Sequence, residues 1–240
     1  MACLFLLLLS ACAGGLRPEA GEKEIEYPAP GTTVGGLLFV PVTGGKRPAV
    51  IVNPGGTKGI DKNIILLCRF LKEQGYVVAA PRYRPSDPKE VSPLKRLFDR
   101  GKIKDSLALI PYLKGLEYVD PENIFMVGHS VGGFVTYGAS VETREIKAFV
   151  AISGVAWSFY CNQEHIRGPV LIIHGDRDMR VDVADVEWAE GALKKNNEVY
   201  EVKIYSGAGH NLFARSTRER LYRDILEWLE RWKGPRAPAQ

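Results

Sequence analysis

The chain has 240 residues, of which 45% are hydrophobic, so it is long enough to bury one substantial core and one domain is expected rather than two. Its 32 basic and 28 acidic residues leave a formal net charge of only +4. This balance argues against a nucleic-acid-binding protein, and the basic residues between 95 and 104 fit a solvated helix face better than an anion or membrane patch.

The N-terminus differs in character from the rest of the chain. Residues 1–9 are apolar and too few to span a bilayer as a helix, but they fit the central region of a secretory signal. Residues 9–12 read L-S-A-C and resemble the bacterial lipobox, in which cleavage precedes a cysteine that carries diacylglycerol. The resemblance implies a signal peptide over 1–11, a lipid on Cys12, a tether over 12–25 and a lipid-anchored place in the cell envelope. An ordinary secretory signal, giving a secreted protein, and a buried N-terminal strand are the alternatives.

Cysteine is sparse in this sequence. With Cys3 removed and Cys12 modified, Cys68 and Cys161 are left in the mature chain. Cys68 lies within an apolar helical pattern and is expected to be a small buried hydrophobic residue. An oxidising compartment would allow a disulfide between Cys68 and Cys161, but nothing in the sequence requires one.

Strand and helix patterns alternate through the body of the chain, residues 26–233. Apolar runs predict strands at 37–42, 48–53, 76–80, 124–127, 148–152, 170–174 and 199–204. Helical spacing predicts helices between Asp61, as the cap, and Gly75, and at 104–116, 134–142, 183–195 and 215–232. This alternation predicts an α/β protein: a three-layer α/β/α sandwich around a mostly parallel, twisted sheet, with a frayed tail at 234–240. In such sheets the functional residues gather at the carboxyl ends of the strands.

The motif G-H-S-V-G-G at 128–133 joins a predicted strand to a predicted helix. It matches G-x-S-x-G, the nucleophile elbow, with Ser130 at its centre. Side chains at Gly128 or Gly132 would collide with neighbouring backbone where the chain reverses. The turn should lift the Ser130 hydroxyl above the sheet and direct the backbone N–H of Val131 toward a substrate.

A serine nucleophile needs a base, because its hydroxyl is almost fully protonated at neutral pH. The chain has four histidines. His129 adjoins the serine and should point away from its oxygen, His174 ends a buried strand, and His165 has no supporting pattern. His210 lies in the glycine-flanked loop 207–211, between the last strand and the last helix, and is therefore the candidate base.

The imidazole in turn needs a carboxylate to fix its tautomer. The strand at 170–174 leads into a turn that carries Asp176 and Asp178. Asp178, beyond the turn, is the better candidate, whereas Asp176 is expected to bond the loop backbone and is kept as the alternative. The resulting order of Ser130, Asp178 and His210 is typical of α/β-hydrolases.

The chain resembles α/β-hydrolases, above all dienelactone hydrolases and the catalytic domains of the prolyl-oligopeptidase type. The resemblance extends over about 48–232 and is carried by D-P-E-N-I at 120–124, G-H-S-V-G-G at 128–133, H-G-D-R-D at 174–178 and G-H at 209–210. It implies the roles of nucleophile, acid and base for Ser130, Asp178 and His210. Dienelactone hydrolases proper use a cysteine nucleophile, so the serine argues against that specific activity.

An oxyanion hole should accompany this nucleophile. One donor is expected to be the backbone N–H of Val131, which follows Ser130. Related enzymes carry H-G-G in the loop after the strand at 48–53, where this chain has N-P-G-G-T. Pro54 has no N–H, so the second donor is expected among Gly55 and Gly56, and the sequence does not choose between them.

The substrate pocket is less defined by the sequence. The connection 153–168 is too short for a large lid, and its Trp157, Phe159 and Tyr160 could line the pocket or simply pack. The stretch R-Y-R at 82–84 ends another strand and could hold a substrate carboxylate or form structural salt bridges.

The sequence therefore predicts a serine hydrolase that cleaves carboxylic esters of small molecules through an acyl-enzyme. No metal or organic cofactor is expected, no nucleic-acid partner is expected, and the membrane is reached only through the N-terminal lipid. The alternatives are a prolyl-oligopeptidase-like peptidase, a thioesterase or acyltransferase, and, from another class, a non-catalytic surface lipoprotein that uses the fold as a binding module. The sequence does not indicate an oligomeric state.

Overall fold

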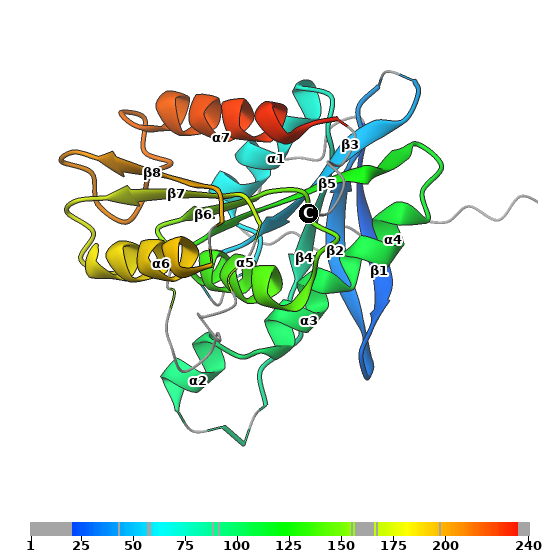
Figure 1. The fold of residues 1–240 in the computed structure, drawn as a ribbon. Coiled ribbons are helices and arrows are strands. Elements are labelled where there is room, and N and C mark those ends of the chain that lie inside the picture. The colour runs from blue at the N-terminus through cyan, green and yellow to red at the C-terminus, as the bar shows by residue number, and fades with distance from the viewer. Residues whose placement is uncertain are drawn as a thin grey trace, which may run out of the picture.

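The structure is a computed structural model that describes residues 21–234 except 43, 57–58, 88, 91, 155, 157–165, 167 and 197. Within these residues eight strands form one sheet, and helices pack on both of its faces (Figure 1). The predicted three-layer α/β/α sandwich with a mostly parallel sheet is confirmed. No helix in the described ranges is long and apolar enough to cross a membrane.

The strand order places the central parallel strands side by side. Across the sheet the strands are β1 (Glu22–Ala29), β2 (Thr32–Phe39), β4 (Val77–Arg82), β3 (Arg47–Asn53), β5 (Val119–His129), β6 (Phe149–Ile152), β7 (Val170–Gly175) and β8 (Tyr200–Tyr205). The six strands from β4 to β8 in this order run parallel, whereas β1 and β2 pair antiparallel at one edge. The carboxyl ends of β3, β5 and β7 therefore meet at one edge of the sheet, where a site is expected.

The folded domain begins earlier than predicted, with the hairpin of β1 and β2. Strand β1 starts at Glu22, inside the range 12–25 that the sequence favours as a tether. Ile25 and Tyr27 alternate with exposed residues and are buried, and the Glu22 carboxylate pairs with Arg69 of α1 at 2.7 and 3.0 Å. The fold therefore includes residues that the domain boundary at 26 leaves out.

Two apolar layers hold the helices on the sheet. Helices α1 (Lys62–Glu73) and α7 (Arg218–Trp232) pack on one face, where Leu221 and Trp228 are buried (Figure 1). Helices α3 (Gly101–Leu107), α4 (Leu109–Lys114), α5 (Val131–Glu142) and α6 (Ala184–Lys195) pack on the other face. The short helix α2 (Pro93–Leu97) lies on an excursion between β4 and α3.

Local signals in the sequence explain the ends of several elements. Asp61 caps α1 as predicted, because its side chain accepts the N–H of Ile64 at 3.0 Å, and Cys68 is fully buried on the inner face of this helix. The helix predicted at 104–116 is instead two short helices that meet at Ala108. At the other end of the chain, the backbone N–H of Gly234 bonds Asn123 at 2.9 Å, so the tail beyond α7 is attached at its first residue.

Candidate active site

The turn at Ser130 has the geometry of a nucleophile elbow. Ser130 adopts φ 56° and ψ −115° between β5 and α5, a conformation that few non-glycine residues adopt. A Cβ at Gly128 would lie 2.0 Å from the carbonyl oxygen of Gly132, and a Cβ at Gly132 would lie 2.0 Å from that of Asn53. Both glycines are therefore required by backbone approach, as the motif predicts.

The structure brings the predicted nucleophile, base and acid together. His210 Nε2 lies 2.9 Å from Ser130 Oγ, and His210 Nδ1 lies 2.8 Å from Asp178 Oδ2. A carboxylate only accepts hydrogen bonds, so Nδ1 carries a proton and Nε2 is left to accept the serine hydroxyl. The three residues come from the ends of β5, β7 and β8, which are far apart in the sequence.

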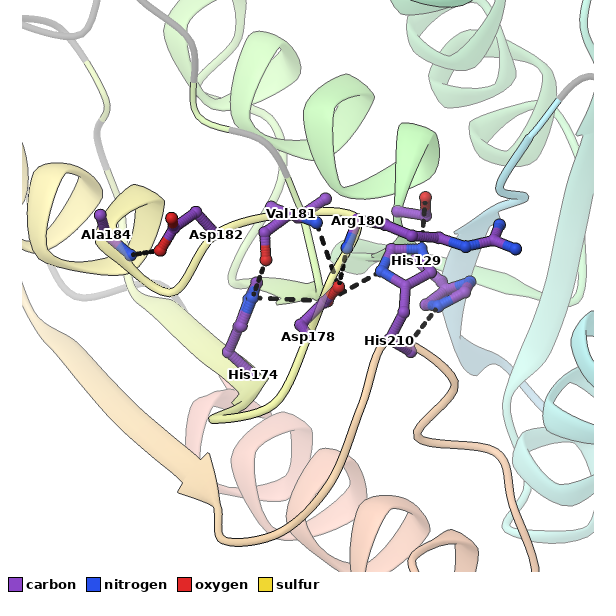
Figure 2. Close-up of polar contacts among 9 residues, drawn as sticks. His129, His174, Asp178, Arg180, Val181, Asp182, Ala184 and His210 are labelled. Atoms are coloured by element: carbon purple, nitrogen blue, oxygen red, sulfur yellow. Dashed lines mark hydrogen bonds and ion pairs between the residues drawn. The ribbon is translucent and has the colours of Figure 1, made fainter.

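The Asp178 carboxylate is buried but well supplied with donors (Figure 2). Its other oxygen, Oδ1, accepts the backbone N–H groups of Arg180 at 2.8 Å and Val181 at 3.0 Å. Burial by itself would raise the pKa of Asp178, but these two bonds and the contact with His210 outweigh it and lower the pKa. The Asp178 carboxylate is therefore ionised at neutral pH.

The two neighbouring polar residues of the β7 turn have structural contacts. Asp176 Oδ1 accepts the backbone N–H of Gly207 at 2.7 Å and so ties the β7 turn to the loop that carries His210. His174 Nε2 donates to the carbonyl of Val181 at 3.0 Å, as expected for a structural histidine. Asp178, rather than the alternative Asp176, is the carboxylate that meets His210.

The loop after β3 lies beside the serine. A Cβ at Gly55 would lie 3.2 Å from the Cβ of Ser130, while Gly56 has φ 66° and lines the same pocket as Ser130 and Val131. The Tyr83 hydroxyl donates to the carbonyl of Pro54, in the same loop, at 3.4 Å. The loop in which the second oxyanion donor is expected thus lies beside Ser130.

A buried polar network at the end of β3 fixes the start of this loop. The Asn53 side chain accepts the hydroxyl of Ser106 at 2.7 Å and donates to the hydroxyl of Thr136 at 3.2 Å. Thr136 in turn donates to the carbonyl of Gly132 at 2.8 Å. These bonds connect β3, α3 and α5 beneath the site. The polar residue at the end of a continuous apolar strand was the only sequence signal for this network.

A pocket of about 510 Å³ opens over Ser130. One wall comes from the segment around α2, which supplies Leu94, Leu97 and Phe98. Of the basic residues between 95 and 104 that are predicted to be solvated, four are exposed, whereas Lys102 is only 5% exposed and donates to the carbonyl of Arg96 at 2.6 Å. The excursion between β4 and α3 therefore shapes the pocket, whereas the sequence pointed to the connection 153–168 and to residues 82–84.

The remaining lining of this pocket combines small and apolar residues with polar and charged ones. It consists of Gly56, Val131, Val181, His210, Arg180, Asp182 and Asp185 in addition to Ser130. Burial raises the pKa of Asp185, and neighbouring Asp182 raises it further, although His174 acts in the opposite direction. One side of the pocket is thus apolar and the other carries acidic groups.

The arginines at 82–84 form salt bridges with carboxylates of the chain. Arg84 binds the fully buried Asp105 through its backbone N–H at 2.8 Å and its guanidinium at 2.5 Å, and Arg82 pairs with Glu24 at 2.9 Å on the surface. Of the two roles expected for these arginines, the structure therefore shows salt bridges within the chain. They also line a second pocket of about 530 Å³, which shares Gly56 with the first and includes Arg96 and Lys102.

His129 packs against His210, the predicted base. Its ring lies 5.2 Å from the His210 ring and meets the ring of Phe213 edge-on at 5.1 Å. Burial lowers the pKa of His129 to about 4, with His210 lowering it further, while the His210 carbonyl, Asp61 and Asp178 act in the opposite direction. His129 is therefore neutral at pH 7.

The low pKa of His129 predicts a loss of stability in acid. An unfolded chain takes up a proton on this residue near pH 6.5, whereas the folded protein does so near pH 4, so the folded state loses stability as the pH falls between these values. The full effect is on the order of 3 kcal/mol. We expect urea unfolding to show that the drop in stability from pH 7 to pH 4.5 is smaller by about 2 kcal/mol in His129→Phe than in the wild type. Equal drops in the two proteins would contradict the assignment.

Several predicted residues lie outside the described ranges. They are Cys12 with the rest of the signal and lipobox, Thr57, Trp157, Phe159, Tyr160, Cys161, His165 and the tail 235–240. The lipid attachment therefore stays a prediction, and the two alternatives given for Cys161 and for the aromatic residues both stand. Within the described residues, no group of three or more histidine, cysteine or acidic side chains is arranged to hold a metal ion.

Comparison with known proteins identifies the family. A model of the dienelactone hydrolase family matches residues 34–231. Protein usf of Aquifex pyrophilus is 27% identical over 211 residues, which cover 83% of this chain and 90% of that protein. Dipeptidyl-peptidase 5 of Porphyromonas gingivalis is 25% identical over 78% of this chain but only 34% of its own length.

Among solved structures, a dienelactone hydrolase-like promiscuous phosphotriesterase from metagenomic libraries has the same fold. The two superpose with a TM-score of 0.73 and 18% identity, over 89% of this chain and 98% of the other. Acylaminoacyl peptidase of Pyrococcus horikoshii superposes with a TM-score of 0.74 over 91% of this chain and 43% of the peptidase. The family model covers most of the sequence, and the chain therefore belongs to the dienelactone hydrolase family, a family of hydrolases with the α/β-hydrolase fold.

Proposed function

We propose that this protein is a serine hydrolase that cleaves carboxylic esters. Ser130 is the nucleophile, His210 the general base and acid, and Asp178 the carboxylate that orients His210. The observation that carries the proposal is the hydrogen-bonded series of these residues, with distances of 2.9 and 2.8 Å, at the floor of a pocket of about 510 Å³. Membership of a hydrolase family supports the same reaction class.

In acylation, Ser130 Oγ attacks the carbonyl carbon of the ester while its proton passes to His210 Nε2. The imidazolium that forms is stabilised by the buried, ionised carboxylate of Asp178. The tetrahedral intermediate then collapses, its bond to the leaving oxygen breaks, and that oxygen takes the proton from His210 Nε2. The products of this half-reaction are an alcohol and an acyl group on Ser130.

In deacylation, a water molecule gives a proton to His210 Nε2 and attacks the acyl carbon. The second tetrahedral intermediate releases the carboxylic acid, and Ser130 recovers its proton from His210. In both intermediates the negative oxygen is bound by the backbone N–H of Val131 and by an N–H from Gly55 or Gly56. Loss of one such donor typically lowers the rate about a hundred- to a thousandfold.

Ester cleavage is placed before peptide cleavage because the matching family is named for a hydrolase of lactones, which are cyclic esters. The family match extends over 34–231 of this chain, whereas the chain spans only about a third of dipeptidyl-peptidase 5. A peptidase of that type uses the same three side chains, so peptide hydrolysis remains the second proposal.

A panel of matched substrates tests the proposal. We expect a neutral short-chain ester to be hydrolysed. The corresponding amide should react at least about a hundredfold more slowly, because an amine is a poorer leaving group than an alcohol. Amide cleavage as fast as ester cleavage would favour the peptidase. If the folded protein hydrolysed neither the ester nor the amide, the proposed function would be contradicted.

A further inference from the structure

His129 lies where three segments of the site meet. It ends β5 immediately before Ser130, its ring contacts His210 and Phe213 of the loop after β8, and it adjoins Gly55 of the loop after β3. Figure 2 shows its ring beside His210, and a hydrogen bond joins His129 Nε2 to the carbonyl oxygen of His210 at 3.2 Å. No step of the proposed mechanism uses this side chain.

The partner atoms fix the tautomer of His129. A carbonyl oxygen only accepts, so the proton of the neutral ring is on Nε2 and is donated to His210. The other nitrogen, Nδ1, faces the loop after β3: a Cβ at Gly55 would lie 3.2 Å from it and 2.9 Å from the carbonyl oxygen of His129. One imidazole thus contacts the base loop and lies next to the oxyanion loop.

The base loop needs such an attachment because its backbone is intrinsically free. His210 follows Gly207, at φ 74°, and Gly209, and glycine restricts the chain less than any other residue. The start of the loop is held by Asp176 through Gly207 at 2.7 Å and by the N–H of Arg177 on the carbonyl of Ala208 at 2.9 Å. Among the described residues, the hydrogen bond from His129 holds the carbonyl group of His210 itself.

We propose that His129 is a positioning residue for the base: its Nε2–H holds the His210 backbone so that the imidazole stays on line between Ser130 and Asp178, and its ring sets how closely the Gly55 loop approaches the serine. This rests on the proposed function, because it assigns a role to a residue that touches no substrate. A displacement of the base by about 1 Å is enough to lower a rate roughly a hundredfold. The role differs from simple packing in that it depends on the donor at Nε2.

Two variants of His129 and one control separate the effect of the Nε2–H donor from that of the aromatic ring. His129→Phe keeps an aromatic ring without the donor, and His129→Gln places an amide N–H near the position of Nε2 without the ring. Tyr76→Phe is the matched control, because it removes one side-chain hydrogen bond, to Glu230 at 2.7 Å, from the apolar layer on the α7 face and away from Ser130. We expect kcat for ester hydrolysis to fall between about tenfold and a hundredfold in His129→Phe, with KM within about twofold.

His129→Gln should recover most of this loss, and Tyr76→Phe should have wild-type kcat. A kcat in His129→Phe within about twofold of the wild type would overturn the proposal, as would equal losses in the Phe and Gln variants, which would indicate packing alone. If His129→Phe does not fold, His129→Asn replaces it, because its amide is too short to reach the His210 carbonyl, and the same difference from His129→Gln is expected.

A measurement that needs no turnover keeps the two proposals distinguishable. The proton on His210 Nδ1, shared with Asp178, should give a downfield signal in the ¹H NMR spectrum of the folded protein. We expect the signal to shift or broaden in His129→Phe and to stay in place in Tyr76→Phe. An unchanged signal in His129→Phe would overturn the role of His129 even if the wild type hydrolysed esters, whereas absence of ester turnover with a shifted signal would overturn only the proposed function.

Discussion

Ser130→Ala should lower kcat for ester hydrolysis by about a million-fold, because removal of a serine nucleophile from a Ser-His-Asp site leaves only the contributions of the oxyanion hole and binding. The fold should be unaffected, since alanine has the same Cβ and meets the same backbone conformation at φ 56°. The measurement is steady-state hydrolysis of the short-chain ester, together with a urea unfolding curve of each protein.

Ser153→Ala is the matched control for this experiment. Ser153, at the end of β6, is the other described non-glycine residue with positive φ, at 45°, and its buried hydroxyl has no hydrogen-bond partner among the described residues. It should retain wild-type kcat. If Ser130→Ala stayed within about tenfold of the wild type, a different group would have to be the nucleophile.

Gly128→Ala should produce the largest loss of stability of any substitution considered. The new Cβ would lie 2.0 Å from the carbonyl oxygen of Gly132 and 2.3 Å from its carbon, which are backbone atoms that no rotamer change can move. We expect the free energy of unfolding to fall by about 3 kcal/mol or more, with a loss of ester hydrolysis because the elbow must shift. Urea denaturation at pH 7 measures the first effect and steady-state kinetics the second.

Gly191→Ala, in α6, is the control for the glycine substitution. Nothing lies within 4 Å of a Cβ at this position, and the residue is helical, so alanine should raise the stability by about 0.5 to 1 kcal/mol. Equal stabilities of the Gly128→Ala and Gly191→Ala proteins would contradict the account of the elbow.

The parallel part of the sheet could be predicted because its strands are covered on both faces. Strands β3, β5 and β7 have continuous runs of buried apolar residues, which are evident in the sequence. Strand β1 was missed because one of its faces is exposed and carries glutamates, so that only Ile25 and Tyr27 indicate a core. In this segment, only the side chains of Ile25 and Tyr27 distinguish an edge strand from the predicted tether.

The three central site residues could be predicted because each follows a recognisable strand in an order typical of the fold. His129 and Asn53 were not assigned their contacts, since these depend on residues up to about eighty positions away, such as His210 and Thr136. The wall from α2 was missed for a similar reason: a short amphipathic segment between β4 and α3 carries no sign of which pocket it covers. Local sequence patterns indicate helices and strands, whereas contacts between distant residues determine which side chains surround Ser130.

The central claim is that Ser130 is a nucleophile activated by His210 and Asp178. Its most direct test is covalent labelling with a fluorophosphonate, followed by intact-mass and peptide mass spectrometry. We predict one adduct per wild-type chain, located on Ser130, and none on Ser130→Ala under the same conditions. A folded wild-type protein that stays unlabelled, or an adduct that persists in Ser130→Ala, would contradict the claim.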